Sequence, residues 1–326
     1  MKLLTVILNW RTPAMSLQSA EAALREMEGI DGAITIVDND SGDGSEALLR
    51  QGVAERGWPE SRVRVLQSGR NGGYGAGNNF GIRAGLPGGG APDFVYILNS
   101  DAFADPGAIR ALLDYMRRTP QCGLAGSYIH GPDGDTHQAT FRFPSVASEF
   151  EGGAQLGIIS RVLSGKSVLL PLPGASGRVD WLAGASLMIR QPVLDRIGLF
   201  DEGYFLYFEE TDLCLRALRA GFETHVVLES SVTHIGSVST GMKEWQRVPG
   251  YWYDSRLRYF SKNYGGLTAA AATAAHVTGG AIHRLRRAVV GRRSADPPRY
   301  LRDLVVHDLK AAASAVPRSR RIEAAE

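Results

Sequence analysis

Two kinds of hydrophobic pattern alternate along the first 130 residues, and this alternation restricts the fold more than any other feature. Short apolar runs with the character of β-strands are separated by segments whose apolar residues recur at helical spacing. The expected strands cover residues 3–8, 33–38, 63–66 and 94–98, and the expected helices cover residues 15–27, 45–56, 75–85 and 106–118. Strands alternating with helices predict an α/β fold, with a Rossmann-like, mostly parallel central sheet flanked by helices.

The rest of the chain divides into an irregular part and a mainly helical part. Residues 131–178 contain many turn signals, so we expect an irregular, mobile excursion there. After this segment the pattern again predicts regular elements, a strand at 186–189, a helix at about 210–220 and a strand at 223–228. The pattern after residue 244 predicts a helical C-terminal extension, whose last helix places Leu301, Leu304, Val305 and Leu309 on one face. We therefore expect two domains, residues 1–240 and 241–326.

Charge and cysteine content limit the cellular setting. Two isolated cysteines, Cys122 and Cys214, suit a reducing compartment such as the cytoplasm. Residues 284–326 hold 11 basic and 5 acidic side chains, whereas the whole chain has a net charge of only +2. Such a basic tail suits the surface of an anionic membrane, and a solvated tail that aids solubility is an equal alternative. We find no signal-peptide or membrane-spanning pattern and expect no nucleic-acid partner.

Polar tripeptides follow three of the expected strands. They are Asn9-Trp10-Arg11, Asp38-Asn39-Asp40 and Asn99-Ser100-Asp101. Ligands of parallel α/β sheets bind outside the carboxyl ends of the strands, so these residues are candidates for a binding site. Asp38 could accept the imide N–H of uracil or thymine, or it could simply form an Asx turn.

Two residues are candidates for holding a metal ion. Asp101 follows a buried-looking strand, and Mg²⁺ and Mn²⁺ bind carboxylate together with phosphate oxygens. His234 follows a later strand, and a neutral imidazole there would favour Mn²⁺. The alternatives are an ordinary turn aspartate and an ordinary core or surface histidine.

An acidic cluster opens the helix expected at 210–220. Glu209, Glu210 and Asp212 follow the aromatic run at residues 204–208. Acidic residues in a first helical turn stabilise the helix dipole, and Asp212 can pair with Arg216 one turn further on. An apolar wall also raises the pKa of a carboxyl group toward that of a general base. Both glutamates are therefore candidates for that role.

A glycine-rich run covers residues 71–79. It follows the third expected strand, whereas a dinucleotide-binding fingerprint follows the first, so that interpretation fails. Glycines still let the backbone approach a phosphate or sugar closely. We expect a loop that covers a nucleotide, with a plain connection into a helix as the alternative.

As a set, these motifs resemble the family 2 glycosyltransferases, inverting enzymes of the GT-A fold, and within them the rhamnosyltransferase-like branch. The matching stretches lie in the family's order at residues 6–10, 37–41, 71–79, 98–101, 181–185, 208–216 and 234–239. The resemblance implies that Asn99-Ser100-Asp101 replaces the family's Asp-x-Asp metal motif and that Asp101 and His234 hold Mn²⁺ or Mg²⁺. The family usually has Glu-Asp at the catalytic pair, and here Glu210 takes the position of the base, with Glu209 as the alternative.

The resemblance also implies the remaining site residues. The expected contacts of the nucleotide-diphosphate sugar are Asn9, Trp10, Asp38, Asn39, Ser41, Asn71, Gly72, Gly73, Gly77, Asn78, Asn99 and Ser100. Asp180 and Trp181 are weaker candidates for an acceptor site, and for Trp181 a place in the core is an equal alternative.

The activity implied by the resemblance is transfer of a sugar to a hydroxyl of a glycan or lipid-linked glycan. The expected donor is dTDP-L-rhamnose, and a UDP-hexose is the nearest alternative. A nucleotidyltransferase would need a glycine-rich loop directly after the first strand, which residues 9–13 lack. A non-catalytic carbohydrate-binding protein would not need Asp101, Glu210 and His234 together. Peripheral contact with an anionic membrane and a homodimer are compatible with this interpretation.

Overall fold

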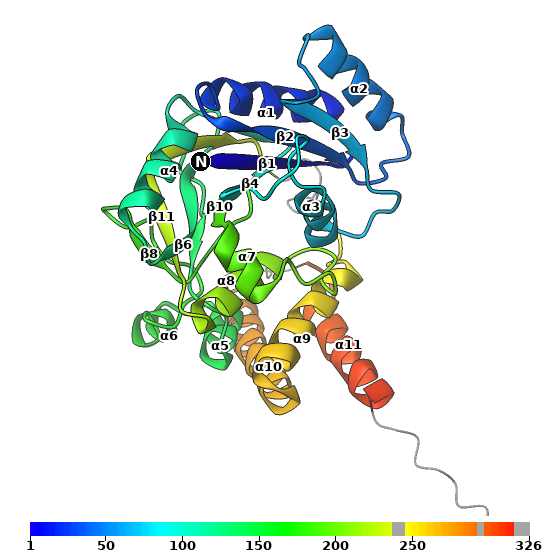
Figure 1. Cartoon of the computed structure of the whole chain (residues 1–326). Coiled ribbons are helices and arrows are strands. Elements are labelled where there is room, and N and C mark those ends of the chain that lie inside the picture. The colour runs from blue at the N-terminus through cyan, green and yellow to red at the C-terminus, as the bar shows by residue number, and fades with distance from the viewer. Residues whose placement is uncertain (237–244, 292–296, 316–326) are drawn as a thin grey trace, which may run out of the picture. The chain divides into compact units, whose positions relative to one another are not determined.

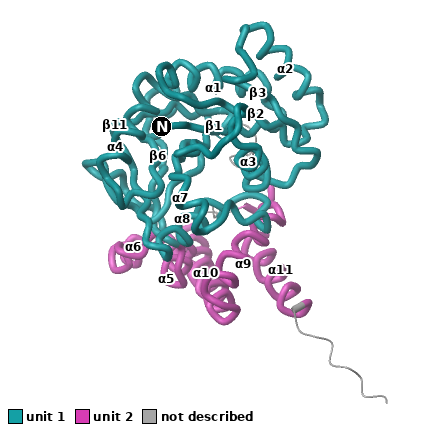
Figure 2. The backbone as a smooth tube through the Cα atoms, in the orientation of Figure 1, with its two compact units in different colours: residues 1–143, 168–244 teal, residues 144–167, 245–326 magenta. Residues whose placement is uncertain are grey.

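We describe a computed structural model of the chain, which covers residues 1–236, 245–291 and 297–315 (Figure 1). Its backbone contacts form two compact units, shown in different colours in Figure 2. Unit 1 comprises Met1–Phe143 and Val168–Glu244, and unit 2 comprises Pro144–Ser167 and Trp245–Glu326. The segment 144–167 thus groups with the C-terminal helices, and the division into domains at residue 240 stays a prediction.

Unit 1 is built on a nine-stranded sheet in the order β3-β2-β1-β4-β10-β6-β11-β5, with β8 paired to β11. Its strands are β1 Lys2–Asn9, β2 Asp31–Asp38, β3 Val63–Gln67, β4 Phe94–Asn99, β5 Ala102–Ala104, β6 Cys122–His130, β8 Gly177–Val179, β10 Ser186–Arg190 and β11 Glu223–His234. Strands β1 to β4 pair in parallel, as do β6 and β11, whereas β10 runs antiparallel between β4 and β6. The mostly parallel α/β sheet predicted from the sequence is confirmed.

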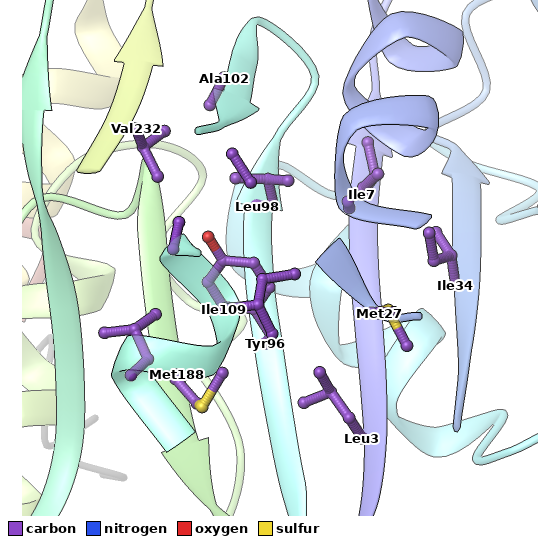
Figure 3. Packing of buried hydrophobic residues seen from close by; sticks show 14 of the residues in the cluster. Leu3, Ile7, Met27, Ile34, Tyr96, Leu98, Ala102, Ile109, Met188 and Val232 are labelled. Atoms are coloured by element: carbon purple, nitrogen blue, oxygen red, sulfur yellow. The ribbon is translucent and has the colours of Figure 1, made fainter. Parts of the chain in front are cut away.

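Helices cover both faces of this sheet because successive strand residues point to opposite sides. In β1, Leu3 and Ile7 join one buried cluster and Leu4 and Val6 join another. The first cluster includes side chains of α1 (Pro13–Glu26), α2 (Ser45–Glu55) and α4 (Ala108–Arg118), and Figure 3 shows part of it. The second includes side chains of α3 (Tyr74–Arg83), α7 (Gln191–Ile197) and α8 (Glu209–Arg219). Both faces are therefore apolar, as a buried parallel sheet requires.

Two helix starts differ from the expected ones. A serine at the start of a predicted helix is a common N-cap, yet Ser45 is the first residue of α2 and Gly44 takes the cap position with φ 87°. The Asp43 carboxylate accepts hydrogen bonds from the Ser45 backbone N–H and hydroxyl. It thereby satisfies one of the backbone N–H groups that have no partner within the first turn of the helix. Pro106 lies before α4 rather than in its first turn, because Gly107, with φ 85°, is the cap.

The segment at 131–178 is more ordered than its turn signals indicated. It contains β7 (Thr140–Phe141), α5 (Val146–Ala154), α6 (Gly157–Val162) and β8, and β7 pairs with β9 (Trp181–Leu182). Ser145 and Ser148 form a capping box that starts α5. A capping box with Ser rather than Glu or Gln at its third position gives a weak sequence signal, which explains why the helix was not predicted.

Unit 2 is helical, as expected for the C-terminal extension. Besides α5 and α6 it contains α9 (Gly250–Tyr264), α10 (Gly266–Val289) and α11 (Tyr300–Ala315). The buried Arg256 guanidinium of α9 lies 2.8 Å from Glu149 on α5, 3.0 Å from Thr273 on α10 and 3.6 Å from Asp308 on α11, so one cation joins four helices. In α11, Leu301 and Leu304 are buried, but Leu309 is exposed, which corrects the expected four-residue face.

Helix α10 is the longest helix of unit 2. No helix in residues 1–236, 245–291 and 297–315 has both the length and the apolar character that crossing a bilayer requires.

Candidate active site

The polar residues predicted at the strand ends lie at one edge of the sheet. The register pairs Asn9 of β1 with Asp38 of β2, and Leu8 of β1 with Asn99 of β4. The sheet therefore brings the carboxyl ends of three parallel strands together, as the sequence pattern predicted. Trp10 follows at this edge, with the Arg11 guanidinium 4.8 Å from the centre of its ring.

The buried carboxylate of Asp38 is held entirely by protein groups in this structure. One oxygen accepts from Asn9 Nδ2 at 2.7 Å and from Ser41 Oγ at 2.6 Å. The other accepts from Gln67 Nε2 at 2.9 Å and from the Ser41 backbone N–H at 3.2 Å. The Ser41 backbone N–H lies three residues on from Asp38, so this bond closes a local turn one residue longer than the Asx turn considered as an alternative. The four bonds together match the usual accepting capacity of a carboxylate. Recognition of a base by Asp38 stays a prediction, and it would require one of these bonds to be exchanged.

The glycine-rich segment forms a loop that turns into α3. Asn71 Oδ1 accepts from the Gly73 backbone N–H and from Asn39 Nδ2, both at 3.0 Å, which joins the loop to the end of β2. Gly73 has φ 88°, and a Cβ there would lie 2.0 Å from the Phe205 carbonyl oxygen. The glycine is therefore needed for close approach to the segment before α8.

Three other residues of this run pack inside unit 1. A Cβ on Gly77 would lie 2.4 Å from Leu8 Cδ1, so this glycine lets α3 lie against β1. Asn78 is fully buried, and its Oδ1 has no hydrogen-bond partner within the described structure. A Cβ on Gly72 would meet Ala76 at 2.7 Å. Packing thus accounts for Gly72 and Gly77, and their contact with a nucleotide remains a prediction.

Asp101 and His234 lie side by side. The antiparallel pairing of β5 with β11 sets His234 opposite Ala102, and the Ile235 backbone N–H donates to the Asp101 carbonyl oxygen at 3.0 Å. As a result His234 Nε2 lies 3.2 Å from Asp101 Oδ1. Ser100 is anchored next to this pair, since its hydroxyl accepts from Thr12 Oγ1 at 3.1 Å.

The pair fits a divalent metal that shares its coordination with a substrate. A carboxylate oxygen and an imidazole nitrogen are both ligands for Mn²⁺, and Asp101 is buried while His234 is half-buried. Within the described residues, no cluster of three or more His, Cys, Asp or Glu side chains is arranged to hold a metal. The remaining ligands would therefore have to come from water or from diphosphate oxygens.

The two adjacent glutamates at the start of α8 have different surroundings. Glu209 is buried, and burial together with the charge of Glu210 raises its pKa well above the usual range. One carboxyl oxygen of Glu209 has no hydrogen-bond partner among the described residues. Glu210 is half-buried, and desolvation raises its pKa to about 7, although backbone hydrogen bonds from Glu210 and Gly184 oppose this. Glu210 therefore matches a general base at neutral pH, whereas burial beside Glu210 favours the protonated form of Glu209.

Two residues that sequence reasoning did not assign lie against Glu210. The Tyr74 hydroxyl donates to the Gly184 carbonyl oxygen at 2.8 Å, and a Cβ on Gly184 would lie 2.3 Å from Glu210 Oε1. The pKa of Tyr74 is raised well above the usual value, first by burial and then by nearby carboxylate charge, chiefly that of Glu210 and also that of Asp101. Because the carboxylates of Glu210 and Asp101 both act on the Tyr74 hydroxyl, the candidate base and the Asp101–His234 pair lie in one region of unit 1. Tyr74 and Gly184 lie in two of the stretches that match the family, residues 71–79 and 181–185. That match was the sequence signal that could have identified them.

The turn into α8 is strained. Tyr207 and Phe208 both have φ 70°, a left-handed conformation that bulky residues rarely adopt. Such strain is characteristic of functional sites, where the surrounding structure enforces it. Here it directs the first turn of α8, with Glu209 and Glu210, toward the Gly184 backbone.

Asp212 and the two acceptor candidates have structural partners. Asp212 is buried and pairs with Arg216 at 2.7 Å, as the helical spacing predicted. Asp180 accepts from the Phe143 backbone N–H at 2.9 Å. Trp181 donates to the Arg142 carbonyl oxygen at 2.9 Å and stacks on Phe141 with 4.2 Å between ring centres. Their role at an acceptor site stays a prediction.

A mostly parallel sheet with this polar edge, an Asp–His pair and a half-buried carboxylate of raised pKa are compatible with a glycosyltransferase of the GT-A class. The family model described as "Glycosyltransferase like family 2" matches residues 3–248. The chain belongs to this family and is an enzyme that transfers sugars, as the motifs predicted.

Individual relatives are rhamnosyltransferases. The chain is 33% identical over 221 residues to the N-acetylglucosaminyl-diphospho-decaprenol L-rhamnosyltransferase of Mycobacterium tuberculosis, covering 64% of this chain and 68% of the relative. It is 28% identical over 135 residues to the rhamnosyltransferase WbbL of Escherichia coli, covering 41% of this chain and 49% of the relative. The recognition of a rhamnosyltransferase-like member of family 2 is thus confirmed.

A solved structure shares the fold. The mannosyltransferase PcManGT of Pyrobaculum calidifontis, in complex with GDP-Man and Mn²⁺, superposes with a TM-score of 0.58 at 12% identity. The match covers 97% of this chain and 81% of that one. At this identity the likeness concerns the fold, and it confirms the predicted GT-A architecture.

Proposed function

We propose that this enzyme transfers L-rhamnose from dTDP-L-rhamnose to a hydroxyl group of a glycan or lipid-linked glycan, with inversion at the anomeric carbon. The names of the relatives support the sugar, since those in M. tuberculosis and E. coli are both rhamnosyltransferases. The M. tuberculosis name also specifies a diphospho-decaprenol acceptor, which supports a lipid-linked glycan here.

The main support for this reaction is the pKa of Glu210, which burial raises to about 7, in the same region of unit 1 as Asp101 and His234. A carboxylate with this pKa is deprotonated in a useful fraction of molecules at neutral pH and still takes up a proton readily. Glu209 suits this role less, because burial and the charge of Glu210 raise its pKa well above the usual range.

The proposed reaction is a single displacement. Glu210 takes the proton of the acceptor hydroxyl while that oxygen forms a bond to the anomeric carbon, and the bond from this carbon to the diphosphate breaks on the opposite side. The Tyr74 hydroxyl holds the Gly184 carbonyl in place, and the Gly184 backbone N–H in turn bonds to Glu210, so the base is oriented before the acceptor arrives. A divalent cation held by Asp101 and His234 would neutralise the charge of the departing diphosphate.

A panel of nucleotide sugars tests this function. The wild-type chain is incubated with dTDP-L-rhamnose, UDP-glucose, UDP-galactose and GDP-mannose, together with a polyprenyl-diphosphate-linked N-acetylglucosamine. Transfer from dTDP-L-rhamnose alone is expected, and Glu210→Gln serves as the inactive control. Preferred transfer from a UDP-hexose would replace the proposed donor, and failure of every donor to react would reject the proposal.

A further inference from the structure

Helix α10 of unit 2 carries a row of exposed apolar side chains along its length. Leu267, Ala271, Ala274, Thr278, Ile282, Leu285 and Val289 follow one another at intervals of three or four residues and are all exposed. This spacing places them on one face of a helix. Leu267 is 90% exposed, Leu285 70% and Val289 80%, so large aliphatic side chains face solvent here. Exposed apolar surface of this extent marks an interaction site.

A second exposed apolar group lies near the C-terminal end of the same helix. Helix α6 exposes 76% of Ile158 and 79% of Val162. Helix α5, which precedes it, packs closely on α10, since a Cβ on Gly153 would lie 2.5 Å from the His276 carbonyl oxygen. The Arg286 side chain of α10 donates to the Gln155 carbonyl oxygen at 3.4 Å, directly before α6. The exposed side chains of α6 therefore lie beside the C-terminal end of α10, which carries Leu285 and Val289.

The charges within α10 and α6 are all positive, although Glu151 of α5 lies beside α6, where it accepts from Ser160 Oγ at 2.6 Å. Helix α10 contains Arg284, Arg286 and Arg287 and no aspartate or glutamate in its 24 residues. Residues 155–167, which include α6, contain Arg161 and Lys166 and likewise no acidic residue. Exposed aliphatic side chains on helices whose own charges are all positive fit an anionic lipid surface, into which the aliphatic groups insert while the cations meet phosphate.

We propose that the exposed face of α10, together with α6, docks unit 2 on the surface of an anionic bilayer, with α10 lying in the plane of the interface. A second copy of the chain fits this face less well, because two copies of α10 would bring arginines together without any carboxylate to pair with them. The proposal concerns where the enzyme works, and it does not depend on the donor or the metal proposed above.

Vesicle flotation tests the docking face without any sugar substrate. The wild-type chain should float with vesicles of phosphatidylcholine and phosphatidylglycerol and bind pure phosphatidylcholine far more weakly. The double variant Leu285→Asp/Val289→Asp should bind anionic vesicles at least about tenfold more weakly, since two aliphatic groups no longer insert. Leu48→Asp, a matched change at a 52% exposed leucine on α2 of unit 1, should bind as the wild type does.

The arginines are tested separately. Arg284→Gln/Arg286→Gln should weaken binding to anionic vesicles by about fivefold for each charge removed, with little effect on neutral vesicles. Unchanged vesicle binding by the Leu285→Asp/Val289→Asp variant would overturn the proposal. So would light scattering that shows a wild-type dimer and a monomeric aspartate variant, since the face would then be a subunit interface. Because flotation involves no transfer, either result would leave the proposed glycosyl transfer standing.

Discussion

His234 Nε2 lies 3.2 Å from Asp101 Oδ1, although 133 positions separate the two residues in the chain. The contact follows from strand pairing, because β5 begins directly after Asp101 and pairs antiparallel with the last residues of β11. The sheet therefore fixes both side chains before any ligand binds. A preformed carboxylate–imidazole pair is suited to hold a cation that bridges to a diphosphate.

Replacing Asp101 by Asn should weaken metal binding by at least about tenfold, since the anionic ligand is lost and the shape is kept. The expected result is a loss of Mn²⁺ affinity measured by electron paramagnetic resonance in the presence of dTDP, with a parallel loss of transfer. Asp135→Asn, which changes an exposed carboxylate on the loop after β6, is the matched control. Unchanged Mn²⁺ affinity in Asp101→Asn would contradict the assignment of this pair.

The two glutamates should respond differently to the same substitution. Glu210→Gln should lower kcat by at least about a hundredfold with unchanged donor affinity, because a general base contributes on this scale. Glu209→Gln should change kcat by less than about threefold, since burial raises the pKa of the Glu209 carboxyl and so favours the neutral form that Gln resembles. Steady-state kinetics under saturating donor distinguish the two, and the reverse order of effects would assign the base to Glu209.

The raised pKa of Glu210 predicts opposite effects of pH on activity and stability. Turnover should rise with pH up to about 7, because only the deprotonated carboxylate acts as a base. The folded chain binds this proton more tightly than the unfolded chain, whose Glu pKa is near 4.5, so the stability due to Glu210 falls as pH rises from about 4.5 to about 7.

Glu210→Gln should remove this pH dependence. Relative to the variant, the wild type should lose on the order of 2 to 3 kcal/mol of unfolding free energy between about pH 4 and pH 8. Urea denaturation of both proteins at a series of pH values measures the difference. A difference that is constant with pH would show that the Glu210 pKa is ordinary in the folded state.

Much of unit 1 could be predicted from sequence because its signals are local. The apolar runs that became β1, β2 and β4 end within one residue of the predicted positions, and the polar residues at their ends lie at a common edge. Strand β11 was predicted only to residue 228, since its pairing with β6 shifts register between Val227 and Ser231. The shift interrupts the alternation of apolar and polar residues on which strand prediction depends. The strand nevertheless continues beyond it to His234.

The parts of the site that sequence reasoning did not find depend on contacts between distant segments. Tyr74 and Gly184 are 110 residues apart, and neither has a chemistry that marks it as catalytic when taken alone. The difference between Glu209 and Glu210 is likewise set by how α8 is oriented, and that orientation follows from the left-handed Tyr207 and Phe208. Adjacent identical residues cannot be distinguished by spacing, so only the fold separates their roles.

Gly184 offers a test of whether the position of Glu210 matters separately from its pKa. A methyl group at Gly184 would lie 2.3 Å from Glu210 Oε1 and 2.6 Å from the Tyr74 hydroxyl, so both groups must move. The Glu210 carboxylate is the end of a flexible side chain and can move at little cost in stability. Gly184→Ala should therefore lower kcat by at least about tenfold, through misplacement of the base, while Tm changes by only a few degrees.

Gly73→Ala is the matched contrast for this prediction. Its methyl group would meet the Phe205 backbone carbonyl at 2.0 Å in a residue with φ 88°, and backbone cannot move aside as a side chain can. Gly73→Ala should thus lower Tm strongly, with a cost in unfolding free energy of more than about 1 kcal/mol. Thermal melting and kinetics on both variants separate the two mechanisms. A fully active Gly184→Ala variant would show that the acceptor hydroxyl is deprotonated without a fixed Glu210, because the inserted methyl group leaves the carboxylate no room at its present position.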